Sequence, residues 1–310
     1  MRELLIDADI FVYKATRLSE REINWEGDSW TLHCDMAEVK TIIDDQISSI
    51  QEATKADKVM LCFSDKKNYR KEVNPEYKSH RKGGRKPMCF IPALDYCKET
   101  YPFKVVKWLE ADDVIGILAT TPSKDERIIV SQDKDLLTIP GKHWDFKEEC
   151  IFDWDEDKAD YKFFYQTLVG DSTDNYKGCQ GVGPISAGKI LDGNTGSVLD
   201  MWEIVLESYL KSGQTLKDAI RNGRMARILR HGEYNFDNNK IPLEQQICLM
   251  KANDTIKEKA MIKLKEVKAK SEDSGSKARQ YLEGLLRIPF GIYREEPILK
   301  VFKETKTDFI

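Results

Sequence analysis

The residues of this 310-residue sequence that are best suited to chemistry are acidic, and they recur where short apolar runs end. One such carboxylate alone is explained well as a turn residue or a helix N-cap. Many of them gathered in one place would repel each other and lose hydration, which proteins offset with bound cations. The set comprises Asp7 after ELLI, Asp65 after VMLCFS, Glu110, Asp112 and Asp113 after VVKWL, Asp133 and Asp135 after IIVSQ, and the later pair Asp171 and Asp174.

Such a set predicts a particular chemistry. Oxygen ligands without a nearby His or Cys suit Mg²⁺ or Mn²⁺, and the number of carboxylates suits two ions. Paired divalent cations are the usual device for hydrolysing a phosphodiester, because one activates water and the other stabilises the leaving oxygen.

A basic stretch adds a second signal. Residues 66–86, KKNYRKEVNPEYKSHRKGGRK, carry nine Lys or Arg against two Glu, with Tyr69 and Tyr77 interleaved. Alone, this run is explained equally well as a solvated charged face, and the net charge of -4 does not favour nucleic acid. Beside the acidic set, the stretch favours a polyanionic substrate, so the two signals together indicate a nuclease.

The elements that must position these residues follow from hydrophobic periodicity. ELLIDA, DKVMLCFS, FKVVKW and RIIVSQ read as buried strands, and residues 35–56 and 111–121 read as helices between them. Alternating strands and helices predict a parallel, three-layer α/β sheet. Ligands bind beyond the carboxyl ends of such strands, which is where the acidic residues fall.

The chain divides by composition into three parts. Residues 1–153 form the expected α/β core, residues 154–240 are mostly helical, and residues 241–310 form a helical extension to which no chemistry is assigned. Seven cysteines without a CxxC pair argue against a disulfide framework and a zinc site. No apolar run approaches the roughly 18 residues that a membrane span needs, and the N-terminus does not fit a signal peptide, so a cytoplasmic protein is expected.

Six segments resemble the flap endonuclease or 5′ nuclease superfamily, which has a PIN-like parallel-sheet core. Within it, the chain is most similar to the bacteriophage double-strand-specific 5′ to 3′ exonucleases. The matching segments, which span about residues 2–240, are LIDAD, CFSDKKNYRKEVNPEYKSHR, LEADDVIG, SQDKDL, GDSTDNYKGCQGVG and NGRMARILRHGEYNF.

The resemblance implies two metal sites. Asp7, Asp65, Glu110, Asp112 and Asp113 would hold the first divalent ion. Asp133, Asp135, Asp171 and Asp174 would place the second. Asp9 stays outside this set.

The basic stretch corresponds in the resemblance to a helical arch at about residues 66–101. Lys78 and Arg81 would then contact and polarise the scissile phosphate, and Arg70 would assist them. Further arch residues are expected to bind DNA: Lys66, Lys67, Lys71, Lys82, Arg85 and Lys86. Three later arginines, Arg224, Arg227 and Arg230, are candidates for backbone contacts.

The glycine turn GCQGVG resembles the hairpin of a helix-hairpin-helix at about residues 170–192. Gly178, Gly181, Gly183 and Ser186 would present backbone amides and a hydroxyl to DNA phosphates. Relatives bind K⁺ here, but Ile185-Ser186 replaces their usual Lys-Thr pair, which puts a potassium ion at this turn in question.

The activity that the resemblance implies is metal-dependent 5′-3′ exonuclease or flap endonuclease cleavage. The expected substrates are duplex, nicked or flapped DNA and the RNA of RNA-DNA hybrids. The expected setting is phage DNA replication and recombination inside the infected cell, by a monomer that meets replication proteins.

Two other functions stay open. A DNA-structure-binding protein that has lost catalysis would keep the basic stretch, although every acidic position is filled here. A haloacid-dehalogenase-type phosphatase would use Asp7 and Asp9 of DAD, but it requires Thr or Ser where Phe11 stands, and it would leave the basic stretch unexplained.

Overall fold

The computed structural model of the chain describes residues 1–81, 83–192, 197–234 and 252–269, and short pieces at 243, 247, 250, 280–282 and 284–286. Alpha-carbon contacts divide it into two units, Met1–Phe236 and Asp237–Ile310. The first unit therefore holds the α/β core together with nearly all of the helical part that composition had set apart. No helix in the described ranges is long and apolar enough to cross a membrane.

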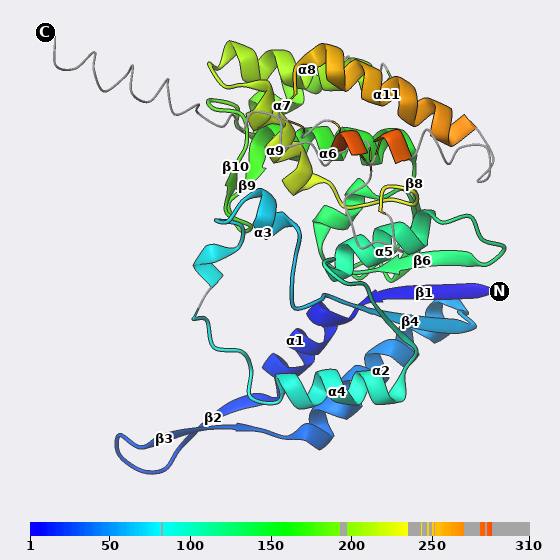
Figure 1. Cartoon of the computed structure of the whole chain (residues 1–310). Helices are drawn as coiled ribbons and strands as arrows, with labels where there is room; N and C mark the ends of the chain where they lie inside the picture. Colours follow the sequence, from blue (N-terminus) through cyan, green and yellow to red (C-terminus); the bar gives the residue numbers. More distant parts are fainter. Residues whose placement is uncertain are drawn as a thin grey trace, which may run out of the picture. The chain divides into compact units, whose positions relative to one another are not determined.

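A six-stranded sheet organises the first unit, in the order β5-β4-β1-β6-β7-β8 (Figure 1). Neighbouring strands run parallel, except that β8 returns antiparallel to β7. All four strands expected from the sequence are present, as β1, β4, β5 and β6, but the prediction that β5 is buried is wrong, because this edge strand is exposed along its length. The bounds are β1 Arg2–Asp7, β4 Lys58–Phe63, β5 Phe103–Val105, β6 Glu126–Val130, β7 Gly141–Asp145 and β8 Cys150–Trp154.

Alternation along the strands sends side chains to two helical layers. Leu4 and Ile6 of β1 pack in one cluster with residues of α1 (Ala8–Ser19), α2 (Met36–Thr54) and α4 (Phe90–Thr100). Leu5 faces the opposite cluster, with α5 (Ala111–Thr120) and the segment that contains Ile228 and Leu229. The three-layer α/β core predicted from the sequence is thus confirmed.

Several strand-end acids begin helices, as their N-cap interpretation predicts. Asp7 accepts a hydrogen bond from Ile10 N at the start of α1, and Asp133 accepts one from Asp135 N at the start of the 3₁₀ helix η2 (Lys134–Thr138). Glu110 and Asp113 form the capping box of α5. Capping fixes the position of each carboxylate at the carboxyl edge of the sheet.

The segment predicted as a helical arch is only partly helical. It contains α3 (Arg70–Val73), the 3₁₀ turn η1 (Ser79–Arg81) and α4, with irregular backbone between them. It runs from α3, which packs on α9 (Leu216–Ala226), to α4 beside α1 and α2 (Figure 1).

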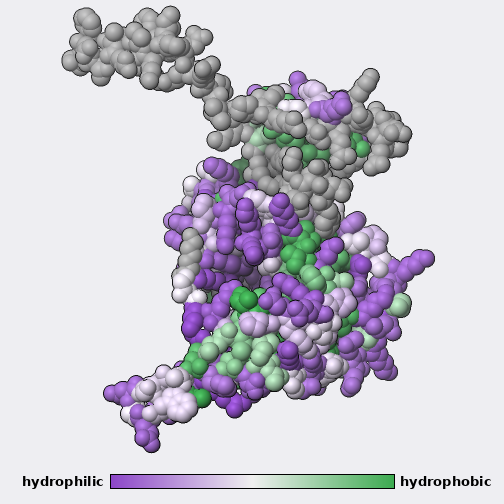
Figure 2. Space-filling model, turned by 60° about the horizontal axis from the view of Figure 1, so that its bottom comes forward, coloured by the Kyte–Doolittle hydropathy of each residue, from purple (hydrophilic) through white to green (hydrophobic). Residues whose placement is uncertain are grey.

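A β-hairpin of β2 (Glu20–Asn24) and β3 (Trp30–Cys34) also belongs to the first unit. It extends from the body; its end is hydrophilic to neutral, and hydrophobic surface lies where it joins the body (Figure 2). Arg85 of the arch segment is tied to this hairpin, because its guanidinium donates to both oxygens of Glu20 at 2.5 and 2.9 Å.

The helical part consists of α6 (Glu156–Val169), α7 (Pro184–Leu191), α8 (Val198–Lys211) and α9, around a core that includes Phe164 and Tyr209. A short antiparallel hairpin, β9 (Gly170–Asp171) and β10 (Tyr176–Lys177), and a glycine turn join α6 to α7. A helix-hairpin-helix at about residues 170–192, with the glycine turn as its hairpin, stays a prediction, as does the binding of phosphate by this turn.

The second unit has an apolar cluster of its own, in which Ile247 and Leu282 pack with Ala260 and Leu264 of α11 (Asp254–Ala269). The described part of this unit agrees with the helical extension expected for residues 241–310. Its role stays unassigned.

Gly178 differs from its neighbouring glycines in a testable way. A Cβ on Gly178 would lie 2.1 Å from the carbonyl oxygen of Leu168, whereas one on Gly183 would meet nothing within 4 Å. We expect Gly178→Ala to destabilise the fold by about 2 kcal/mol or more through forced backbone shifts. Gly183→Ala is the matched control and should leave the melting temperature nearly unchanged. Equal melting temperatures for the two variants would refute the packing role of Gly178.

Candidate active site

Four carboxylates at the ends of β1, β6 and the start of α5 influence one another. Burial and the charge of Asp9 raise the pKa of Asp7 to about 7. Burial, Asp7 and Asp133 raise the pKa of Asp112 well above its ordinary value. Burial also raises the pKa of Asp9. These groups thus form an acidic cluster at the carboxyl edge of the sheet, with little positive charge among them.

Asp9 is the member of this cluster that the sequence analysis left out. Its Oδ2 accepts a hydrogen bond from the backbone N of Ser64 at 3.0 Å. Asp65 Oδ2 accepts a hydrogen bond from Trp108 N at 2.8 Å, on the β5–α5 connection, and its role at a metal site stays a prediction. The motif LIDAD could have indicated Asp9, because Asp7 and Asp9 are two residues apart across the junction between β1 and α1.

Glu110 belongs to a different environment. Burial by itself would raise its pKa, but the charges of Lys78 and Arg70 outweigh burial and hold the pKa at about 2. Lys78 Nζ lies 2.8 Å from Glu110 Oε1 and 3.5 Å from Asp174 Oδ2. Glu110 is therefore ionised at all ordinary pH values and neutralised by cations of the arch segment.

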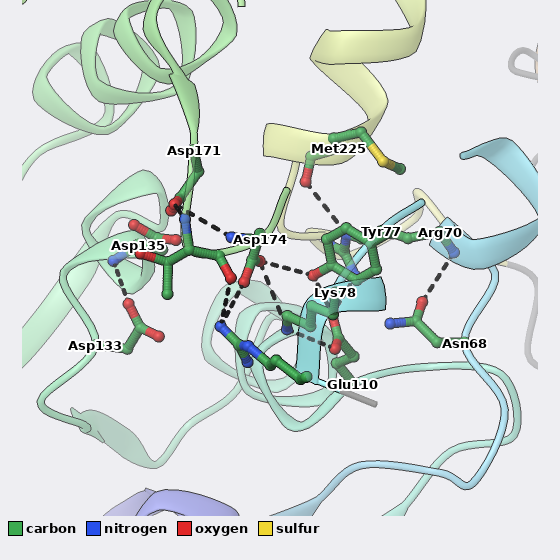
Figure 3. A network of polar contacts seen from close by, with 12 residues as sticks. Asn68, Arg70, Tyr77, Lys78, Glu110, Asp133, Asp135, Asp171, Asp174 and Met225 are labelled. Atoms are coloured by element: carbon green, nitrogen blue, oxygen red, sulfur yellow. Dashed lines mark hydrogen bonds and ion pairs between the residues drawn. The ribbon is translucent and has the colours of Figure 1, made fainter. Parts of the chain in front are cut away.

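The arch segment contacts the acidic loop between β9 and β10 (Figure 3). Arg81 donates to Asp174 Oδ1 and to the carbonyl oxygen of Thr173, both at 2.9 Å. The backbone N of Lys78, which has a left-handed φ of 51°, donates to the carbonyl oxygen of Asp174 at 3.0 Å. Lys78 and Arg81, both predicted from the sequence, thus lie directly at the acidic site.

Tyr77 links the two acidic regions and was missed by the sequence analysis. Its hydroxyl lies 2.8 Å from Glu110 Oε2 and 2.9 Å from Asp174 Oδ2 (Figure 3). The residue is only 3% exposed, and burial raises the pKa of its hydroxyl. Tyr77 therefore stays protonated and able to donate, but no spacing in the sequence distinguishes it from a core tyrosine.

The second acidic group lies between η2 and the β9–β10 loop. Burial and the charges of Asp133 and Asp171 raise the pKa of Asp135 to about 6. Gln166 of α6 donates to Asp135 at 2.6 Å and orients it. Asp171 accepts from Thr173 N and Asp174 N, which shapes the loop. The structure thus brings together Asp133, Asp135, Asp171 and Asp174 as expected.

The roles predicted for Arg70, as a contact to phosphate, and for Asp113, as a metal ligand, require a correction. The guanidinium of Arg70 donates to both oxygens of Asp113, at 2.6 and 2.7 Å, and to the carbonyl oxygens of Met225 and Arg227. Both side chains are buried, with 3% and 0% of their surface exposed. Arg70 therefore does not face a phosphate, and Asp113 has no free oxygen for a metal, because the pair serves to hold the fold together.

The predicted DNA-binding residues fall into three groups. Lys66, Lys67, Lys71 and Lys86 are exposed, and so are Gly181, Gly183 and Ser186 of the turn before and in α7. Lys82 lies outside the described residues. Arg85 pairs with Glu20 while its side chain stays 54% exposed, and Gly178 is buried against α6; DNA binding by these two residues stays a prediction.

The donor set fits a divalent metal by its chemistry. Carboxylates that raise each other's pKa are relieved by a cation, and the donors are all oxygens. Within the described ranges, however, no three Asp, Glu, His or Cys side chains converge as a formed metal site. Several acidic oxygens are instead bound by protein donors, as in the 3.0 Å hydrogen bond from Ser131 to Asp7.

Comparison with known proteins identifies the class of protein to which the chain belongs. Residues 3–163 match the model of the 5′-3′ exonuclease N-terminal resolvase-like domain. The fold agrees, since the structure resembles that of the T5 5′-exonuclease with divalent zinc ions, with a TM-score of 0.54 and 17% identity over 73% of this chain and 88% of that one. A complex of the T5 flap endonuclease with DNA and metal ions gives a TM-score of 0.53, with 17% identity over 73% of this chain and 89% of that one.

Two phage relatives match over most of their length. The exonuclease of Escherichia phage T7 is 32% identical, over 77% of this chain and 92% of the relative. The exodeoxyribonuclease of Enterobacteria phage T3 is 31% identical, over 77% of this chain and 91% of the relative. A flap endonuclease of Shewanella baltica is 31% identical over 41% of this chain and 53% of its own length. The chain belongs to the 5′-3′ exonuclease family.

Substitutions of the adjacent residues Asp112 and Asp113 should have different effects, one on cleavage and the other on the stability of the fold. Asp113→Ala removes the bidentate partner of the buried Arg70, which then keeps only Glu110 at 3.2 Å as a counter-charge, and should destabilise the fold by about 3 kcal/mol. Asp112→Ala removes a carboxylate from a repulsive cluster, so it should leave the melting temperature unchanged or higher while abolishing cleavage of duplex DNA. Thermal unfolding and a nuclease assay on both variants check this. A large loss of stability in Asp112→Ala would contradict the assignment.

Proposed function

We propose that this protein is a divalent-metal-dependent 5′ nuclease that hydrolyses phosphodiester bonds near 5′ ends, nicks or flaps in duplex DNA. The observation that carries the proposal is the meeting of two opposite charges at one edge of the sheet. Acidic residues from β1, α5, η2 and the β9–β10 loop lie there, and arch cations lie directly against them. Family membership supports the same reaction.

The residues take distinct roles in this proposal. Asp7, Asp9, Asp112 and Glu110 would hold one divalent ion, and Asp133, Asp135, Asp171 and Asp174 would hold another. Bound divalent cations supply the activation of water and the stabilisation of charge on the phosphate. The identity of the metal is proposed as Mg²⁺, with Mn²⁺ as a substitute, because both favour oxygen donors.

The protein's own part is positioning and charge. Lys78 and Arg81 would exchange their carboxylate partners for phosphate oxygens of the substrate, since both carry several donors that suit either anion. Tyr77 would keep Glu110 and Asp174 in register while this exchange takes place. Such preorganised charge favours the more negative transition state over the ground state.

The biological setting of this activity is also part of the proposal. Removal of RNA primers from RNA-DNA hybrids, and a role in phage DNA replication and recombination beside replication proteins, are consistent with a 5′ nuclease of this family. The phosphatase alternative loses support, because Phe11, at the position where that enzyme class requires a hydroxyl, is 6% exposed within the core.

A product-length analysis tests the reaction. We expect magnesium-dependent release of short 5′ products from blunt, nicked and flapped duplexes that share one sequence. Asp133→Asn, which removes one acidic charge at little cost in volume, should bind the same duplexes without cleaving them. Binding by the wild-type protein without any magnesium-dependent cleavage would support the non-catalytic alternative and overturn the enzyme.

Lys78 supplies a second test. Lys78→Ala should lower kcat by about a hundredfold, because it removes preorganised positive charge at the reacting phosphate, while duplex binding weakens only modestly. Lys124→Ala is the control: Lys124 is exposed and precedes β6, at the opposite edge of the sheet. Single-turnover kinetics measure the effect. Equal rates for the two variants would remove Lys78 from the reaction.

A further inference from the structure

Glu20, at the junction of α1 and β2, binds the stretch of the arch segment that precedes α4. Its side chain is only 1% exposed, and each carboxylate oxygen accepts two hydrogen bonds. Arg85 donates to Oε1 at 2.5 Å and to Oε2 at 2.9 Å, Met88 N donates to Oε1 at 3.2 Å, and Arg17 donates to Oε2 at 2.5 Å. The hydrogen bonds of Arg85 above all hold the pKa of Glu20 at about 2, so this carboxylate is ionised at ordinary pH values.

Local structure restrains this stretch of the arch only weakly. Gly83 has a left-handed φ of 86° and is followed by Gly84, and consecutive glycines leave the backbone few steric limits. In the described part of residues 83–89, three residues form hydrogen bonds to elements outside the arch segment. Two of the three, Arg85 and Met88, bind Glu20. The Glu20 clamp, which is Glu20 with Arg85 and Met88, therefore attaches this stretch to the body of the protein.

Helix α1 connects the Glu20 clamp with the acidic cluster. Asp7 caps the start of α1, Asp9 lies in its first turn, and Glu20 directly follows its last residue. Burial raises the pKa of Asp9, and the charge of Lys86 acts in the opposite direction, so Lys86 lies near the cluster. Because one helix carries both the acids and the clamp, the clamp fixes this stretch of the arch relative to the acidic edge.

The Glu20 clamp matters most when substrate is bound. In the proposed function, Lys78 and Arg81 exchange their carboxylate partners for phosphate oxygens of DNA, so the attachments that their side chains give the arch are lost. The clamp lies outside this exchange, because the carboxylate of Glu20 is almost inaccessible and receives donors from both α1 and the arch segment. It can thus hold the arch in place during the reaction.

We propose that Glu20 is a positioning residue, which keeps the arch segment at the acidic edge by binding Arg85 and Met88. Lys78 and Arg81 then meet the phosphate in the geometry that the reaction needs, since a displacement of about 1 Å can cost roughly a hundredfold in rate. This inference rests on the proposed function and extends it to a residue that touches neither metal nor substrate.

Glu20→Gln tests the positioning role, because it keeps the volume of the side chain and removes its charge. We expect a roughly tenfold lower single-turnover rate of duplex cleavage with Mg²⁺, while duplex binding in EDTA hardly changes. Without DNA, hydrogen exchange should become faster in the peptide that contains Met88. The matched control is Glu38→Gln, because Glu38 pairs with Arg21 of β2 at 2.5 Å and its described hydrogen bonds lie outside the arch segment.

A double-mutant cycle with Arg85→Gln distinguishes the clamp from a direct contact of Arg85 with DNA. If Glu20 and Arg85 act through one ion pair, the double variant should cleave no more slowly than either single variant. Additive losses of rate overturn the clamp, as does a loss of duplex affinity in Arg85→Gln that Glu20→Gln does not share. Arg85 has a 54% exposed side chain, so Arg85→Gln provides the same kinetic test if Glu20→Gln does not fold.

The remaining outcomes separate the clamp from the proposed function. A wild-type rate or unchanged hydrogen exchange in Glu20→Gln overturns the positioning role. Equal losses in Glu38→Gln also overturn it, because the effect would then reflect any ion pair beside β2. Absence of magnesium-dependent cleavage by the wild-type protein would instead overturn the proposed function, and the positioning role with it.

Discussion

The buried ion pair between Arg70 and Asp113 is the contact on which the rest of the active region depends. It joins three segments that are distant in sequence: the base of the arch at α3, the start of α5 and the end of α9. A buried guanidinium requires all its donors to be satisfied, so the positions of these elements are strictly coupled. The same guanidinium reaches Glu110 at 3.2 Å, which carries the coupling to the acidic edge.

The carboxylates around this pair have two kinds of environment: some are paired with cations, and others lie near other acids. Asp113 and Glu110 are matched with cations, and Glu110 accordingly has a pKa of about 2. Asp7 is buried and Asp112 and Asp135 are half-buried near other acids, and loss of hydration with mutual repulsion raises their pKa values. The first environment stabilises the fold. The second environment leaves the carboxylates repelling one another, which is typical of sites that bind a cation or carry out a reaction.

The positive residues of the arch segment lie between Glu110 of α5 and Asp174 of the β9–β10 loop. Lys78 and Tyr77 contact both Glu110 and Asp174, and Arg81 contacts Asp174, so one short segment spans α5 and the β9–β10 loop. Because the cations are only partly buried, with 20% and 47% of their side chains exposed, they can change partners at modest cost.

The sequence by itself determined the strands and the acidic edge. Apolar runs show where β1, β4, β5 and β6 lie, and parallel pairing then brings their carboxyl ends together, so the acids after them had to meet. It could not distinguish Asp112 from Asp113, which differ only by a rotation of about 100° on the helix. Tertiary structure decided that Asp113 faces Arg70, that Asp9 lies close enough to Asp7 to raise its pKa, and that Tyr77 bridges two acidic groups. These outcomes depend on packing between α3, α5 and α9, which local patterns do not encode.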